Sequence, residues 1–169
     1  IFFMLEKKYI VNSQSAQLKL ERLALEVAEQ LNGDNTPLIL IGIANSGIVI
    51  ANKMGELLQH YFTEPIQIIS VTLNKSNPDI VTLSNELDFN GKNIIVCDDV
   101  ANSGKTLLYA LKPLLNYAAK RIQILVLVER MHKQFPIKPD YVGLTIATTL
   151  QNNIVVEIEG IEIVGAFIQ

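Results

Sequence analysis

The most informative stretch of the chain is residues 94–107, IIVCDDVANSGKTL. It begins with four apolar residues, typical of a buried strand, and runs directly into the adjacent carboxylates Asp98 and Asp99. A turn of small and polar residues, Ala101 to Gly104, comes next, and Lys105 and Thr106 begin a helical pattern. A buried strand that leads through a polar turn into a helix is typical of an α/β protein.

The turn in this stretch predicts a phosphate site of a particular kind. Gly104-Lys105-Thr106 resembles the end of a nucleotide-triphosphate P-loop, but that motif needs a glycine where this chain has Asp99. Small residues at a helix start can instead aim successive backbone N–H groups at one phosphate. Ser103, Lys105 and Thr106 would add side-chain donors to this cradle.

The acidic pair beside the cradle would repel a phosphate, so Asp98 and Asp99 make sense facing sugar hydroxyls or a phosphate-bound Mg²⁺. A phosphate on one side and cis hydroxyls on the other describe a ribose 5-phosphate. Two other interpretations exist: the pair could cap the helix, or it could form the acidic pocket of a receiver domain. In a receiver domain, however, the pair should follow the first strand, whereas here it follows the third.

The rest of the chain alternates apolar strand patterns with amphipathic helical patterns, which predicts a doubly wound, mostly parallel sheet. The expected helices are 13–31, 47–61 and 104–119, the last broken at Pro113, and the expected strands are 38–43, 66–73, 93–97 and 122–128. Residues 74–91 predict a long functional loop or hairpin, 133–140 a loop, and 141–169 short strands. Together these predict one domain over residues 1–169, with a small hood of short strands and loops.

Composition limits the classes of protein that the chain can belong to. Its 169 residues are 49% apolar and 18% charged, with a mean hydropathy of +0.29, which excludes a disordered chain. A net charge of −3 and a pI near 5.4 give no support for binding nucleic acid through many phosphates. The longest charge-free apolar stretch, residues 36–52, contains Pro37 and Gly42 and predicts strand, loop and helix rather than a membrane span. The single cysteine, Cys97, excludes an internal disulfide framework and predicts a reducing, cytoplasmic compartment.

Residues 98–106, preceded by their apolar strand, resemble the phosphoribosyl-pyrophosphate signature of type I phosphoribosyltransferases. The segment 42–47, GIANSG, stands where that family has its pyrophosphate loop. Residues 128–132 (VERMH) and 136–143 (PIKPDYVG) resemble the base-side region of one branch, the pyrimidine-operon attenuator/uracil phosphoribosyltransferases. The resemblance covers nearly the whole chain and implies the type I phosphoribosyltransferase fold.

The resemblance also implies a role for each candidate residue. The catalytic and metal-binding pair would be Asp98 and Asp99, on the ribose hydroxyls near Mg²⁺, with Arg130 near the pyrophosphate or the base. The 5-phosphate would lie on Ala101, Asn102, Ser103, Gly104, Lys105 and Thr106, and the pyrophosphate on backbone N–H groups of Ala44, Asn45, Ser46 and Gly47. In the base pocket, Val142 main-chain groups would read the pyrimidine edge and Tyr141 would supply ring surface.

The implied activity is Mg²⁺-dependent transfer of ribose 5-phosphate from phosphoribosyl pyrophosphate to a nucleobase, uracil first, by a homo-oligomer. Three departures from the family pattern bear on this expectation. The segment 44–46 lacks the basic side chains of the branch's pyrophosphate loop, and residues 74–91 are shorter than its mobile hood. Hypoxanthine-guanine enzymes have an aspartate that serves as base toward the purine at the position where this chain has Asn102, and this disfavours a 6-oxopurine substrate.

Two functions of other classes stay open. Members of the branch also bind RNA as nucleotide-responsive regulators, and the first helix keeps Lys19 and Arg22, although the chain lacks a broad basic stripe. The non-basic pyrophosphate loop would also permit a ligand-binding module that no longer turns over. Lys75 is a candidate to reach the pyrophosphate from the 74–91 loop, and His132 is a candidate phosphate donor.

Overall fold

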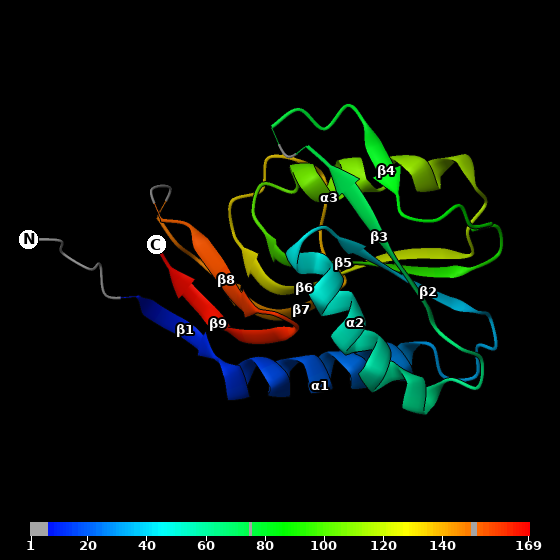
Figure 1. The fold of residues 1–169 in the computed structure, drawn as a ribbon, viewed down its shortest axis with the longest axis horizontal. Helices are drawn as coiled ribbons and strands as arrows, with labels where there is room; N and C mark the ends of the chain where they lie inside the picture. Colours follow the sequence, from blue (N-terminus) through cyan, green and yellow to red (C-terminus); the bar gives the residue numbers. More distant parts are fainter. Residues whose placement is uncertain (1–6, 75, 150–151) are drawn as a thin grey trace, which may run out of the picture.

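The computed structural model describes residues 7–74, 76–149 and 152–169, and within them the main feature is a six-stranded sheet (Figure 1). Its strand order is β4-β3-β2-β5-β6-β7, and all neighbours are parallel except β3 and β4. The strands are β2 Leu38–Ile43, β3 Gln67–Leu73, β4 Val81–Leu83, β5 Asn93–Ala101, β6 Arg121–Arg130 and β7 Tyr141–Ile146. The predicted mostly parallel α/β sheet is confirmed.

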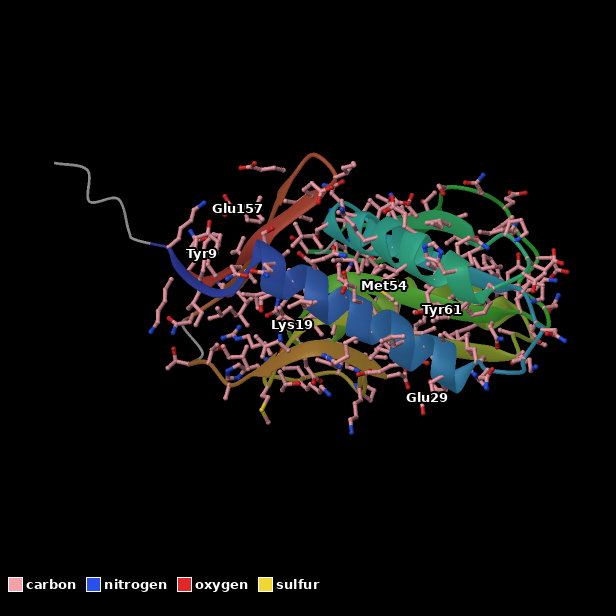
Figure 2. The ribbon with its side chains drawn as sticks, turned by 90° about the horizontal axis from the view of Figure 1, so that it is seen from below. Tyr9, Lys19, Glu29, Met54, Tyr61 and Glu157 are labelled. Carbon is pink, nitrogen blue, oxygen red and sulfur yellow. The ribbon has the colours of Figure 1, made fainter. Side chains whose placement is uncertain are left out.

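Helices cover both faces of this sheet. Helices α1 (Ser13–Gln30) and α2 (Ser46–Leu58) run side by side over one face, as Figure 2 shows, and a 3₁₀ turn, η1 (Gln59–Tyr61), extends α2. On the other face lie the short helix α3 (Lys105–Ala110) and the 3₁₀ turn η2 (Lys112–Asn116). Each face has its own buried cluster of apolar side chains, so the sheet is doubly wound as predicted.

The sequence explains why α1 forms where it does. The Asn12 side chain caps the helix by accepting a hydrogen bond from the Ser15 N–H at 2.8 Å. Buried positions then recur at helical spacing along one face: Ala16, Leu20, Leu23, Ala24 and Val27. The helix stops before a turn in which Gly33 has a φ of +76°.

A second, three-stranded antiparallel sheet combines both ends of the described chain. Its order is β1 (Lys8–Asn12), β9 (Glu162–Ile168) and β8 (Ile154–Glu159). The sheet stands at the side toward which the arrows of the parallel strands point, and β8 contacts β5 (Figure 1). Strands β8 and β9 are among the short strands expected over residues 141–169, whereas strand β1 was not predicted from the sequence, because its partner β9 lies about 150 residues away.

The boundaries of two elements differ most from the expectation. The strand predicted over residues 93–97 continues to Ala101, because the pairing with β6 goes on from Asp98↔Val126 to Ala101↔Glu129. The helix predicted over residues 104–119 is only α3 followed by η2, because Pro113 cannot donate a backbone hydrogen bond. Among the described residues, no helix combines the length and the apolar character needed to cross a membrane.

Candidate active site

The carboxyl ends of the parallel strands form one edge of the sheet, and the candidate residues gather there. Ala101 of β5 pairs with Glu129 of β6, which in turn pairs with Thr145 of β7. The loops after β2, β5, β6 and β7 consequently leave the sheet on the same side, facing the small sheet (Figure 1). In open α/β sheets this edge is where ligands bind.

The first turn of α2 packs directly against β5, and a glycine makes this possible. A Cβ added to Gly47 would lie 2.6 Å from the Cys97 carbonyl oxygen and 3.2 Å from Asp98 Oδ1. Gly42, at the end of β2, is equally tight, since its Cβ would lie 2.3 Å from the Ile48 Cα. The turn from β2 into α2, which holds residues 44–47, thus lies against the acidic pair.

The backbone of this turn is free of side-chain capping. Asn45, the residue before α2, makes no side-chain capping hydrogen bond, and the Ala44–Asn45 peptide is cis. The Ala44 N–H donates to the Val71 carbonyl at 2.9 Å, so the turn begins by continuing the sheet toward β3. Asn45 is exposed and Ser46 half-buried, and the Asn45 side chain leaves the first N–H groups of α2 uncapped.

The two carboxylates of the site differ in burial. Asp98 is only 2% exposed, and its Oδ1 accepts a hydrogen bond from the Asp99 N–H at 2.9 Å. Asp99 is half-buried, and its Oδ1 accepts from the Val100 N–H at 2.8 Å. These local bonds fix the direction of both carboxylates at the end of β5. Asp99 is the one with solvent access for a ligand.

The turn after β5 is braced by the loop that follows β6. The Ser103 carbonyl accepts hydrogen bonds from the Gln134 and Phe135 N–H groups at 2.9 and 3.0 Å. Gly104 adopts a φ of +86°, a left-handed conformation that glycine reaches without strain, and this turns the chain into α3. Asn102 is exposed, whereas Ser103, Lys105 and Thr106 are half-buried and Ala101 is buried.

Arg130 lies at the end of β6 and is 7% exposed. Its Nε donates to Thr148 Oγ1 and its Nη2 to the Thr149 carbonyl, both at 2.6 Å. The ring of His132 also contacts the Thr148 carbonyl, at 2.5 Å from Nε2. Both residues therefore face the segment after β7, and nothing in the sequence pattern pointed to Thr148 or Thr149 as their partners.

The structure places Tyr141 away from this edge, which corrects the expectation that its ring lines a base pocket. Tyr141 pairs with Leu125, well before the level of Ala101, and its ring is 4% exposed within the core beneath α1. Its hydroxyl donates to Gln123 Oε1 at 3.0 Å and also bonds Gln30, while burial raises its pKa. An aromatic ring this well buried, with its hydroxyl satisfied, is a packing residue.

Val142 is engaged as well. Its carbonyl and that of Gly143 accept hydrogen bonds from Arg22 Nη2 at 3.0 and 2.8 Å, which ties α1 to the edge strand β7. Of the Val142 main-chain groups predicted to read a pyrimidine edge, the carbonyl thus accepts a hydrogen bond within the chain itself. Lys75, the other candidate for the pyrophosphate, lies outside the described residues.

A metal ion at this edge would depend on Asp98 and Asp99. The described residues bring together no group of three or more His, Cys, Asp or Glu side chains that could hold a metal ion. Mg²⁺ usually takes one or two carboxylates and completes its octahedron with water and substrate phosphate oxygens. Asp99 fits that pattern, provided that the substrate supplies the remaining ligands, whereas the adjacent Asp98 is only 2% exposed.

Comparison with known proteins agrees with this geometry. Residues 9–159 match the family model described as the phosphoribosyl transferase domain. The chain is similar to proteins named "Bifunctional protein PyrR". It is 31% identical to that of Latilactobacillus sakei over 167 residues, covering 92% of this chain and 93% of the relative. It is 33% identical to that of Actinobacillus pleuropneumoniae over 156 residues, covering 84% of each.

Solved structures share the fold. The hypoxanthine phosphoribosyltransferase of Trypanosoma cruzi, in a ternary substrates complex, superposes with a TM-score of 0.77 at 14% identity, over 97% of this chain and 96% of that one. A hypoxanthine-guanine phosphoribosyltransferase of Bacillus anthracis gives a TM-score of 0.74 at 19% identity, over 95% and 96%. The chain therefore belongs to the phosphoribosyltransferase family, in the branch of the bifunctional PyrR proteins.

Proposed function

We propose that this phosphoribosyltransferase moves ribose 5-phosphate from phosphoribosyl pyrophosphate to a pyrimidine base, with uracil preferred, in a Mg²⁺-dependent reaction. The observation that carries the proposal is the contact of Gly47 with β5, because it sets an uncapped helix start beside Asp98 and Asp99. A turn rich in N–H donors suits the phosphate groups of a ligand, and an adjacent acidic pair suits its sugar hydroxyls. Phosphoribosyl pyrophosphate has both, since its ribose carries a 5-phosphate and a pyrophosphate. The bond from the anomeric carbon to a pyrophosphate oxygen would break, a bond to the base nitrogen would form, and the proton of that nitrogen would leave to water or to the released pyrophosphate.

The ribose 5-phosphate would lie on the turn after β5. The N–H groups of Asn102, Ser103 and Gly104 would bind it there, whereas the Lys105 N–H already donates to Ser103 Oγ at 3.3 Å. Ser103 is held by the two N–H groups donated to its carbonyl. Asp99, which has solvent access, would accept from the ribose hydroxyls. A site held this firmly favours catalysis by positioning, which an oxocarbenium-like displacement needs more than it needs a strong base.

The pyrophosphate would face residues 44–47. That turn offers the backbone N–H groups at the start of α2, and positive charge from its own side chains is absent. The residues that would hold Mg²⁺ are Asp98 and Asp99, together with substrate oxygens, and bound Mg²⁺ would neutralise charge on the departing pyrophosphate. Because the turn lacks a lysine or arginine, we expect strong dependence of activity on the divalent ion.

Asn102 supports the choice of a pyrimidine. It is exposed just after β5, and an amide cannot act as a general base toward a purine nitrogen. The RNA-binding alternative receives less support. Arg22 of α1 already donates to the Val142 and Gly143 carbonyls and pairs with Glu26, so these donors are not available for RNA phosphates. A ligand-binding module that has lost turnover is one outcome of the experiment below.

The test is pyrophosphate release from phosphoribosyl pyrophosphate with Mg²⁺, measured with uracil, orotate, hypoxanthine, guanine and adenine. Release with uracil alone is expected. Release with a purine alone would keep the transfer chemistry and overturn the argument from Asn102. If no base gives pyrophosphate release while calorimetry still detects binding of phosphoribosyl pyrophosphate, the protein is a binding module. RNA binding that weakens with added salt would indicate the RNA-binding regulator.

Substitution of Asp99 gives a sharper test. We expect Asp99→Asn to lower kcat/KM at least tenfold, about 1.4 kcal/mol of transition-state stabilisation, because an amide is a poorer ligand for Mg²⁺ and a poorer acceptor for ribose hydroxyls. The control is Glu29→Gln, which makes the same carboxylate-to-amide change at an exposed position of α1, outside the candidate site. Wild-type activity in Asp99→Asn would remove this carboxylate from the mechanism.

We also propose that the protein acts as a homo-oligomer in the cytoplasm. Light scattering at low and high protein concentration measures the mass, for which a multiple of 18.8 kDa is expected. A monomer at every concentration would contradict this.

A further inference from the structure

The direction from which the base arrives follows from the arrangement of the loops. In a displacement at the anomeric carbon, the incoming base attacks from the side opposite the leaving group. Residues 44–47, proposed for the pyrophosphate, follow β2, which neighbours β5 on one side. On the other side of β5 lie β6 and then β7. The base would therefore approach over the ends of β6 and β7.

At that place, the last residue of β6 and the two residues that follow it hold the end of β7 and the segment after it. Arg130 donates to Thr148 Oγ1 and to the Thr149 carbonyl, and the Met131 N–H donates to the Ile146 carbonyl at 3.1 Å. The His132 ring adds a contact to the Thr148 carbonyl. We call residues 130–132 and 146–149 with these contacts the β6–β7 clamp.

The hydrogen bonds of Arg130 indicate that it fixes the position of its partners in the clamp. Its guanidinium is buried, and both bonds from it go to neutral oxygens rather than to a carboxylate. Burying a cation is costly unless its donors are used, so the two 2.6 Å bonds fix Thr148 and Thr149 relative to β6. The planar fork of arginine can hold both acceptors at once, which a lysine ammonium on its flexible stem does less well.

Resting on the proposed function, we propose that Arg130 is a positioning residue that sets base affinity by holding Thr148 and Thr149 as a wall of the base subsite. It acts through these two residues and does not contact the pyrophosphate. The consequence is a separation of effects: loosening the clamp weakens binding of the base and leaves binding of phosphoribosyl pyrophosphate nearly unchanged.

The experiment compares Thr148→Val and Arg130→Lys with the wild-type enzyme in steady-state kinetics, with uracil and phosphoribosyl pyrophosphate varied separately. Thr148→Val keeps the shape and removes the Oγ1 acceptor, whereas Arg130→Lys keeps the charge and loses the fork. For both we expect KM for uracil to rise about tenfold while KM for phosphoribosyl pyrophosphate stays within about twofold. Thr148→Ser keeps an Oγ acceptor and is expected to restore most of the base affinity.

The matched control is Thr63→Val, at an exposed threonine in the turn before β3, away from the ends of β6 and β7. It is expected to leave both KM values unchanged. Full activity in Arg130→Lys, or a rise in KM for phosphoribosyl pyrophosphate in Thr148→Val, would overturn the inference, since Arg130 would then act by charge or on the sugar phosphate.

Failure of the proposed function is recognised separately, in the wild-type enzyme. If it releases no pyrophosphate with uracil but does so with another base, the variants are compared with that base instead. The same result is expected: KM for the base rises about tenfold and KM for phosphoribosyl pyrophosphate stays within about twofold. If no base reacts, calorimetry with uridine 5′-monophosphate and with phosphoribosyl pyrophosphate replaces kinetics. Thr148→Val must then weaken binding of uridine 5′-monophosphate and leave binding of phosphoribosyl pyrophosphate unchanged. An equal loss of affinity for both ligands, or no difference from the wild type, would refute the clamp.

Discussion

At Gly47 the first turn of α2 touches β5, and no side chain fits between them. The nearest atoms to an added Cβ are the Cys97 carbonyl oxygen and Asp98, neither of which can move without disturbing β5. Gly55 of the same helix is different, because its Cβ would meet the Cδ1 tip of Ile68 at 2.4 Å, and that tip can rotate away. Of the two glycines of α2, Gly47 therefore makes a contact that cannot adjust to a larger side chain, whereas Gly55 makes one that can.

We expect Gly47→Ala to cost about 1–3 kcal/mol of stability and to lower pyrophosphate release, because α2 must shift away from the acidic pair. Thermal unfolding and the release assay measure the two effects. Gly55→Ala is the control. It is expected to change stability less, because alanine has a higher intrinsic helix propensity than glycine and this offsets part of the crowding against Ile68. A Gly47→Ala enzyme with wild-type stability and activity would show that the close approach is unimportant.

At the scale of elements, one carboxylate joins three segments at the opposite, amino edge of the sheet. Asp34, in the turn between α1 and β2, accepts from the Thr36 N–H and from Lys120 Nζ, each at 2.9 Å, and from Asn93 Nδ2 at 3.1 Å. Hydrogen bonds from Thr36 and Lys120 hold the pKa of Asp34 well below its ordinary value. The turn is thereby fastened to the starts of β5 and β6.

This arrangement predicts a pH-dependent stability difference for Asp34→Asn. Because the folded-state pKa is lowered, the stabilisation is present above the unfolded-state pKa of about 3.9 and is lost as pH falls toward the folded-state value. The Tm of Asp34→Asn should lie below that of the wild type at pH 7, and the gap should narrow below about pH 4. Asp79→Asn, an exposed carboxylate, should show no such trend, and a pH-independent gap for Asp34→Asn would contradict the assignment.

The sequence predicted those elements whose signals are local. The apolar run of β2 ends at the predicted residue, and α1 begins at the predicted Ser13, because caps and periodicity lie within the element itself. Strand β1 and the extension of β5 to Ala101 depend on partners distant in the chain, so no local pattern indicates them. Likewise Tyr141 resembles a ligand-binding aromatic in sequence, and only the packing beneath α1 shows its place. The roles of Asp98, Asp99 and residues 44–47 stay predictions.

At the scale of the whole molecule, two buried clusters share one sheet. The cluster beneath α1 and α2 contains Leu23 and Met54, and the cluster beneath α3 contains Val126 and Phe89. Since β2, β5 and β6 contribute side chains to both clusters, neither layer keeps its packing surface if the sheet is lost. We therefore expect both layers to unfold together.

Leu23→Ala tests this coupling. Leu23 is fully buried, so the change is expected to cost about 2–5 kcal/mol and to lower the denaturation midpoint of the whole chain in one transition. Far-ultraviolet circular dichroism and tyrosine fluorescence should give the same midpoint. Leu25→Ala, two residues along and 55% exposed, is the control with little change. Separate transitions for the two probes would show that the layers unfold independently.

The solitary thiol of the chain has a practical consequence. Cys97 is completely buried in β5, and burial raises its pKa, so the folded protein offers alkylating reagents no reactive sulfur of its own. A cysteine introduced at one exposed position, such as Ser84 beside β4, would be the single point at which a maleimide dye attaches. Paired with a fluorescent nucleotide, such a dye would report distances across the molecule without prior removal of the native cysteine.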